Sequence, residues 1–376
     1  MSVNAKNEEP RTNASADARR TRTTPRACGG RSGAASASHV ALLAALLLFA
    51  PTASVARRQS GPVGKSQNPT QPHGVAKPFS GERAFEHVRR LVDFGPRPAG
   101  SKALERARRY ILEQLPTGAR REEWTADTPA GRVKMVNIVL DVPGETAETI
   151  IIASHYDTKR FKEFRFVGAN DGGSSTGVLI ELARLLSDPG RRGRFTYRFV
   201  FFDGEEAVCR EWDDCGKPGA PDNTYGSRHH VAQLRAAGRL KGVRALILLD
   251  MVGYEKLELG RDEMSTPWLV DLVWGTAREL GYSKQFVARA ESVGGDDHEP
   301  FLRAGVPSVD LIQLGTYPHW HTAGDTLDKI APASLKAVGD VVLASLPRLE
   351  ERLLKGGAEA GEGGAGPEEP SKPPAP

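Results

Sequence analysis

Acidic and histidine side chains follow the ends of several short apolar runs in this sequence, and two more, Asp171 and His321, lie in loops ahead of a predicted helix and after the last predicted strand. The set comprises His155, Asp157, Asp171, Glu205, Glu206, Asp250 and His321. Zinc binds imidazole nitrogen and carboxylate oxygen, and a catalytic zinc uses three protein ligands and keeps one position open. The pattern therefore predicts a metal site, for which Asp171, Glu206 and His321 can supply the three ligands.

Glu205 and Glu206 are neighbours in the chain and can still serve different partners. Adjacent side chains on a regular strand point to opposite faces. This pair, however, follows Gly204 at the predicted exit of a strand, where the backbone can turn. One glutamate can then bind metal while the other faces the substrate as a general acid or base. The alternative interpretation is a solvated acidic turn.

Strands and helices are predicted to alternate between residues 78 and 355. Apolar runs predict strands at 137–142, 149–155, 197–202, 245–249 and 308–312. Helical periodicity predicts helices at 84–92, 104–115, 174–186, 226–237, 268–280 and 334–354. This order is typical of a single α/β domain with a mostly parallel, mixed central sheet and helices on both faces, in which the first two strands are expected to form an antiparallel hairpin. Such sheets collect functional groups beyond the carboxyl ends of their strands, where the candidate ligands fall.

The two ends of the chain differ in composition from its centre. Residues 1–56 combine a basic leader, an apolar run at 40–50 that is too short to span a bilayer, and small residues at 53–56. This order predicts a secretory signal cut near Ala56 and an exported, periplasmic or secreted protein; the alternative is a permanent membrane anchor. Residues 57–77 and 356–376 are rich in Gly and Pro with little apolar content, and we expect a disordered linker and tail.

The charge of the chain limits its expected partners, and its cysteines bear on the redox state of its compartment. The formal charge of +4 shrinks once the basic leader is removed, and no basic stripe remains for nucleic acid. We expect a monomer that meets the membrane only through an uncleaved signal. Cys209 and Cys215 are the cysteines that follow the leader, and they fit either a small-loop disulfide of an oxidising compartment or two free thiols.

Five strings of the sequence, taken in order, resemble the motifs of the M28 zinc peptidases. They are SHYDTK at 154–159, VGANDGG at 167–173, FFDGEE at 201–206, LDM at 249–251 and WHT at 320–322. The resemblance covers roughly residues 80–350 and implies the zinc-dependent exopeptidase fold, which is phosphorylase/hydrolase-like. It also implies that Asp171, Glu206 and His321 bind zinc, that Glu205 is the general base, and that Asp157 orients His155 from behind the metal ligands.

Three features resemble the glutaminyl-peptide cyclotransferase branch more than the aminopeptidases. An inserted loop that carries Trp212 follows Glu206, Asp296 stands where aminopeptidases usually have a small hydroxyl residue, and Trp320 precedes His321. This branch converts the N-terminal glutamine of peptides and proteins to pyroglutamate and releases ammonia. The resemblance implies one Zn²⁺, a pocket walled by Trp212 and Trp320, and a proton shared between Asp250 and Asp296 if these two are in contact.

The sequence also departs from the animal cyclases. Gly294 and Gly295 are smaller than the residues expected before Asp296, Thr316 or Tyr317 stands where a pocket aromatic is expected, and the cysteine spacing differs. These departures concern the substrate pocket and leave the metal site intact.

Two rival interpretations use the same residues. A di-zinc M28 aminopeptidase would recruit His155 and Asp250 to a second zinc, with Asp171 bridging the two ions, and would hydrolyse N-terminal residues from peptides. A binding module that has lost catalysis is disfavoured, because no ligand or base position is missing from the sequence.

Overall fold

The structure is a computed structural model that describes residues 77–212, 214–217 and 219–362. The predicted secretory signal, nearly all of the predicted linker and residues 363–376 of the predicted tail lie outside the described residues. None of the described helices combines the length and the apolar character that crossing a lipid bilayer requires.

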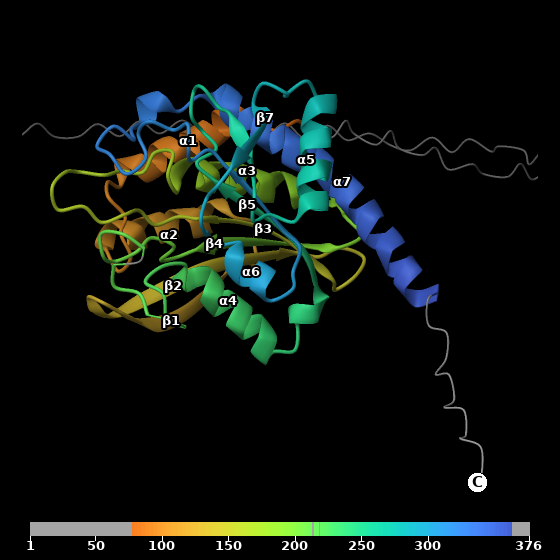
Figure 1. The fold of residues 1–376 in the computed structure, drawn as a ribbon, viewed down its shortest axis with the longest axis horizontal. Coiled ribbons are helices and arrows are strands. Elements are labelled where there is room, and N and C mark those ends of the chain that lie inside the picture. Colours follow the sequence, from red (N-terminus) through yellow and green to blue (C-terminus); the bar gives the residue numbers. More distant parts are fainter. Residues whose placement is uncertain (1–76, 213, 218, 363–376) are drawn as a thin grey trace, which may run out of the picture. The chain divides into compact units, whose positions relative to one another are not determined.

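A six-stranded mixed sheet forms the centre of the fold, with the strand order β1-β2-β4-β3-β5-β8 (Figure 1). Its strands are β1 (Arg120–Thr128), β2 (Gly131–Val142), β3 (Thr149–His155), β4 (Thr196–Phe202), β5 (Val243–Asp250) and β8 (Ser308–Ile312). β4, β3, β5 and β8 run parallel to one another, whereas β2 is antiparallel to β4 and β1 is antiparallel to β2. The predicted α/β fold with a mostly parallel, mixed sheet is therefore confirmed.

The predicted hairpin between β2 and β3 is wrong, because β4 lies between these two strands. Ile138 of β2 pairs with Phe201 of β4 in antiparallel register, and Ile152 of β3 pairs with Phe199 of β4 in parallel register. The hairpin instead joins β1 to β2. The sequence did not predict β1, because this edge strand is mostly exposed and has no apolar run.

Helices cover both faces of the sheet (Figure 1). One face carries α1 (Gly81–Asp93), α2 (Lys102–Gln114), α3 (Gly173–Leu186), α5 (Pro267–Glu279) and α7 (Pro332–Glu362), and the other carries α4 (Tyr225–Ala236) and α6 (Glu299–Arg303). Ile150 and Ile152 of β3 pack in the first layer, whereas Ile151 and Ala153 pack in the second. A strand that is buried on both faces needs a continuous apolar run, which is why β3 could be predicted from sequence.

The remaining elements are short, apart from the end of α7. A second, parallel sheet consists of β6 (Leu259–Asp262) and β7 (Phe286–Glu291), and β6 contacts β8 of the main sheet. Single turns of 3-10 helix occur at η1 (Pro189–Arg191), η2 (Leu240–Gly242) and η3 (Leu327–Lys329). α7 continues to Glu362, so it extends into the segment predicted as a tail, where Ala and Glu favour a helix.

Candidate metal centre and active site

Parallel strands bring the candidate side chains to one edge of the sheet. His155 is the last residue of β3, Asp250 is the last residue of β5, and Glu205 and Glu206 follow the end of β4. These three strands are neighbours that run in the same direction, so their carboxyl ends meet. Two loops also reach this edge. The loop before α3 carries Asp171, and the loop after β8 carries His321.

Asp171, Glu206 and His321 come together as the sequence predicts. Nε2 of His321 lies 3.4 Å from Oδ2 of Asp171 and 3.4 Å from Oε1 of Glu206. The three potential ligand atoms lie within 4.8 Å of one another. Oδ2 of Asp171 is buried without a hydrogen-bond partner among the described residues. Two buried carboxylates and an imidazole that converge in this way form a donor set suited to Zn²⁺.

Unusual backbone conformations hold these side chains in place. Gly204 has a φ of +73°, which provides the turn between β4 and the glutamate pair. Gly172 has a φ of +72°, and a Cβ there would lie 2.5 Å from the carbonyl oxygen of Asp157. His321 itself has a φ of +51°, a conformation that costs energy in a residue with a side chain and that often marks functional sites.

Asp157 contacts both His155 and the backbone of the glutamate pair. Its Oδ1 lies 3.6 Å from Nδ1 of His155, the contact that the sequence predicts. The same carboxylate accepts hydrogen bonds from the backbone N–H groups of Glu205 at 3.2 Å and Glu206 at 3.4 Å. Asp157 therefore connects the end of β3 to the turn after β4.

Two positioning residues escaped the sequence analysis. Asp325 accepts hydrogen bonds from the backbone N–H groups of Asn170 at 2.8 Å and Asp171 at 3.1 Å, and from the hydroxyl of Tyr317 at 2.7 Å. Lys159 is 1% exposed, and its Nζ donates to the carbonyl of Ala207 and lies 3.9 Å from Oε2 of Glu206. The signal for Asp325 was its position four residues after His321 in the same loop.

His155 belongs to a second group of potential metal ligands, which shares Asp171 with the first. Its Nε2 lies 3.2 Å from Oδ1 of Asp250 and 3.3 Å from Oδ1 of Asp171, and these three residues form a second group that could hold an ion. Its Nδ1 lies 3.7 Å from Oε2 of Glu205. Burial lowers the pKa of His155, but the surrounding carboxylates, led by Asp250, outweigh burial and raise this pKa well above its ordinary value.

Glu205 is a buried carboxyl group in a strongly acidic environment. Burial raises its pKa well above the ordinary glutamate range, and the charges of Glu206 and Asp296 add to this increase, while His155 opposes it. At His321 burial lowers the pKa, yet the neighbouring carboxylates raise it to about 10. Glu205 therefore combines a place beside the candidate metal ligands with a high proton affinity, which suits a group that accepts and returns a proton.

Asp296 joins this acidic region from the loop before α6. Burial and, to a smaller extent, the charge of Asp250 raise its pKa to about 6. Asp310 of β8 is completely buried, and one of its carboxylate oxygens lies within 4.8 Å of a carboxylate oxygen of Asp296. Asp310 was not among the predicted site residues, although a charged residue in the middle of an apolar strand is a usable signal.

A pocket of approximately 300 Å³ opens above these groups. Its floor contains the catalytic and metal candidates, and its walls include Trp212, Trp320, Leu314 and Gly294. Trp320 is 43% exposed, and its ring stacks on the imidazole of His321, with the ring centroids 4.3 Å apart. Tyr317, considered as a pocket aromatic, is instead buried against Asp325 and does not line the pocket.

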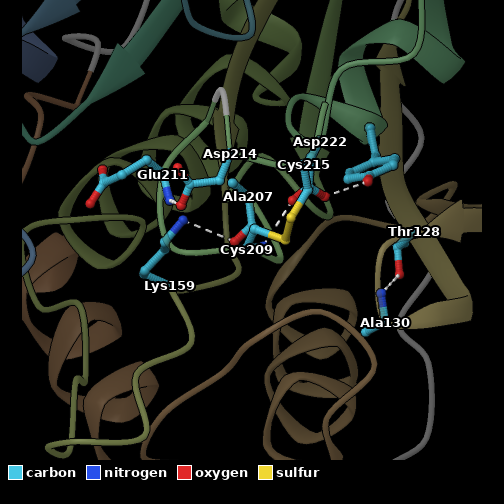
Figure 2. Close-up of a disulfide and its surroundings, with 10 residues drawn as sticks. Thr128, Ala130, Lys159, Ala207, Cys209, Glu211, Asp214, Cys215 and Asp222 are labelled. Atoms are coloured by element: carbon cyan, nitrogen blue, oxygen red, sulfur yellow. Dashed lines mark hydrogen bonds between the residues drawn. A yellow bond between two sulfur atoms is a disulfide. The ribbon is translucent and has the colours of Figure 1, made fainter. Parts of the chain in front are cut away.

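The loop that carries Trp212 is closed by a disulfide between Cys209 and Cys215 (Figure 2). The backbone N–H of Cys209 donates to Asp222 at 2.8 Å, and that of Glu211 donates to Asp214 at 2.9 Å. The inserted loop is thus tied to itself and to the segment that leads into α4, which places Trp212 at the pocket.

Comparison with known proteins agrees with this arrangement. Residues 137–346 match peptidase family M28. Glutaminyl-peptide cyclotransferase of Drosophila melanogaster is 26% identical over 276 residues, which cover 65% of this chain and 75% of that protein. The solved glutaminyl cyclase of an Acidobacteriales bacterium is 34% identical with a TM-score of 0.69, covering 78% of this chain and all of that chain.

One solved structure with a different name is similarly close. A leucine aminopeptidase precursor from Bacteroides thetaiotaomicron is 29% identical with a TM-score of 0.65, covering 73% of this chain and 98% of that chain. The family match spans more than half of the chain, and the bacterial glutaminyl cyclase aligns over its full length. The chain therefore belongs to peptidase family M28, in the branch that contains the glutaminyl cyclases.

Proposed function

We propose that this protein is a zinc-dependent glutaminyl-peptide cyclotransferase that converts N-terminal glutamine to pyroglutamate and releases ammonia. The observation that carries the proposal is the position of Asp296, which lines the same pocket as Asp250 and Glu205. The names of the similar proteins support the same reaction.

Asp171, Glu206 and His321 would hold the zinc ion. The fit rests on the convergence of their ligand atoms and on the buried, unpartnered Oδ2 of Asp171. Zinc bound there supplies Lewis-acid polarisation of the side-chain amide carbonyl. The test of this site is His321→Ala, which should abolish tight zinc binding, with His319→Ala in the same loop as the matched control. Stoichiometric zinc in purified His321→Ala protein would show that the site is wrong.

Glu205 would move the proton in the reaction. The α-amine nitrogen of the substrate forms a bond to the carbon of its own side-chain amide, and the bond from that carbon to the amide nitrogen breaks. Glu205 takes the proton from the attacking amine and gives it to the departing nitrogen, which leaves as ammonia. A positioned general base of this kind contributes about 10²–10⁴ in rate.

Asp250 and Asp296 would bind the leaving amide nitrogen. Two carboxyl groups in one buried, acidic region cannot both ionise at low cost, so one of them keeps a proton. The charged member can accept a hydrogen bond from the amide N–H. Trp212 and Trp320 would exclude bulk water, the competing nucleophile, from the pocket.

The second candidate is a di-zinc aminopeptidase. It is favoured by one observation, the convergence of His155, Asp171 and Asp250 within 4.8 Å. Such an enzyme would release free N-terminal residues, and it would not need a carboxylate at the position of Asp296.

The remaining proposals concern the chain around this site. We propose that residues 1–56 are a secretory signal that directs the protein to the periplasm or the exterior, that residues 57–77 are a linker, and that the catalytic domain spans 78–355. The substrates would be the N-termini of peptides or proteins, acted on by a monomer.

The experiment that tests the function compares two peptides that differ only in their first residue. The enzyme should release ammonia from the glutamine peptide and leave the leucine peptide largely uncut, and Asp296→Ser should weaken cyclisation. Rapid release of leucine without any ammonia from the glutamine peptide would favour the aminopeptidase.

A further inference from the structure

A second pocket of approximately 730 Å³ adjoins the active site. The two pockets share Trp212 and Gly294 as lining residues, so Trp212 forms part of the wall between them. The outer pocket is otherwise formed mainly by α4, by α6 and by the segment around Pro221.

Among the described residues, basic side chains outnumber acidic ones in the lining of the outer pocket. Lys217, Arg228, Arg235 and Arg303 line it, and Glu299 is the acidic residue among the described part of this lining. Arg303 is paired with Glu299 at 2.5 Å. Within the described part of the chain, no carboxylate lies within ion-pair distance of Arg228 or Arg235, so the described lining of this pocket carries an excess of positive charge.

Arg228 is fixed in a way that leaves part of its guanidinium available. Its Nε donates to the carbonyl of Asn223 at 3.2 Å, and its Nη2 donates to those of Pro221 at 2.9 Å and Asn223 at 2.7 Å. The ring of Tyr225 packs 4.9 Å from the guanidinium carbon. Nη1 has no acceptor among the described residues, although a guanidinium can donate from all of its nitrogens. A positioned, partly desolvated Arg of this kind suits a carboxylate ligand.

The inner pocket has the opposite charge. Glu205, Glu206, Glu211, Asp250 and Asp296 line it together with Asp171. The substrate's N-terminal amine and reacting amide belong in this acidic pocket, and the rest of the peptide must leave it past one of its walls. Trp212 and Gly294 line both pockets, so a peptide that extends past these two residues reaches the larger basic pocket.

We propose that the basic pocket is a subsite for an acidic side chain that follows the N-terminal glutamine of the substrate, so that the enzyme prefers acidic peptides. This inference rests on the proposed function for its substrate, and it adds a sequence preference. Arg228 and Arg235 are the specificity residues, and Trp212 separates their subsite from the reacting centre.

The expected preference is moderate, because Arg235 is exposed and ion pairs in contact with water contribute little. We expect kcat/KM for an acidic peptide to exceed that for a neutral peptide by about three- to tenfold at low salt, and we expect added salt to reduce this ratio. The difference should lie mainly in KM, because the subsite does not touch the reacting atoms.

The experiment uses three peptides that begin with glutamine and carry Glu, Gln or Lys at the third and fourth positions. Wild-type protein should cyclise them in that order of preference. Arg235→Gln should reduce the preference by lowering kcat/KM for the acidic peptide alone, and the matched control Arg278→Gln, which changes an exposed arginine on α5, should keep the preference. Arg235→Glu should reverse it.

A binding measurement separates this inference from the proposed function. The affinity of the fluorescently labelled acidic peptide is measured for wild type, Arg235→Gln and Arg278→Gln. If no peptide is cyclised but Arg235→Gln alone weakens binding, the reaction is wrong and the subsite stands. If the three peptides are cyclised with equal kcat/KM, or if Arg235→Gln changes neither rate nor affinity, the subsite is wrong and the reaction stands.

Discussion

Nε2 of His155 lies 3.2 Å from Oδ1 of Asp250, at the junction between the ends of β3 and β5. One imidazole nitrogen cannot donate a hydrogen bond to Asp250 and bind a metal ion at the same time. The use of this nitrogen therefore distinguishes a one-zinc cyclotransferase from a two-zinc aminopeptidase.

We predict one zinc ion per chain. Asp296 lines the same pocket as Asp250, and a carboxylate that shares a proton with a second carboxylate would be a weak ligand for a second cation. Metal analysis of protein equilibrated with excess zinc and then desalted should give one equivalent. His155→Gln should leave that equivalent in place, whereas two equivalents in wild type and one in the variant would support the two-zinc site.

Replacing Glu205 with Gln should separate proton transfer from metal binding. The amide has nearly the same shape, and the backbone contact of this residue to Asp157 is kept. We expect the variant to retain zinc and thermal stability and to lose activity by at least about 10²-fold. If the variant loses zinc instead, the roles of Glu205 and Glu206 must be exchanged.

The pH dependence of kcat/KM should reflect the acidic surroundings of Glu205. A base must be deprotonated to act, and burial raises the pKa of this carboxyl group, so activity is lost as the pH falls through that raised value. A zinc ion bound next to Glu205 would lower the pKa of this carboxyl group and would oppose the increase caused by burial. The acidic limb of the profile should still lie above the ordinary glutamate pKa of about 4.3. An acidic limb at or below that value would contradict the assignment of Glu205 as the base.

Removing the disulfide should affect the pocket more than the metal site. The double variant Cys209→Ser with Cys215→Ser frees the loop that holds Glu211 and Trp212. Loss of the cross-link should lower the free energy of unfolding by about 2 kcal/mol and raise KM for glutamine peptides, with zinc content unchanged. Reductant should have the same effect on wild type and none on the double variant. An unchanged KM would show that the disulfide does not position Trp212.

The sequence predicted those parts of the site that depend on neighbouring parallel strands. Buried strands require apolar runs, and the rule that functional groups lie beyond their carboxyl ends brought His155, Glu206 and Asp250 together in advance. The position of Asp310 near Asp296 depends on how β8 packs against a distant loop, which no local pattern encodes. Likewise, β4 lies between β2 and β3, and the apolar runs of β2 and β3 do not show which strand each of them pairs with.

The sequence alone also could not decide whether the two cysteines form a disulfide, and it could not predict the charge of the outer pocket. Two cysteines separated by six positions fit both a disulfide and free thiols until the path of the loop is known. Arg228 and Arg303 come from helices far apart in the chain, and they share a pocket because α4 and α6 lie on the same face of the sheet.

The most direct test of the central claim follows the side-chain nitrogen of an N-terminal glutamine. A peptide is made with an isotopic label on that amide nitrogen alone and is incubated with the zinc-loaded protein, and the products are analysed by mass spectrometry. We predict labelled ammonia and a peptide that keeps every residue, with an unlabelled pyroglutamate at its N-terminus. Free glutamine that carries the label, together with a peptide shortened by one residue, would contradict cyclisation.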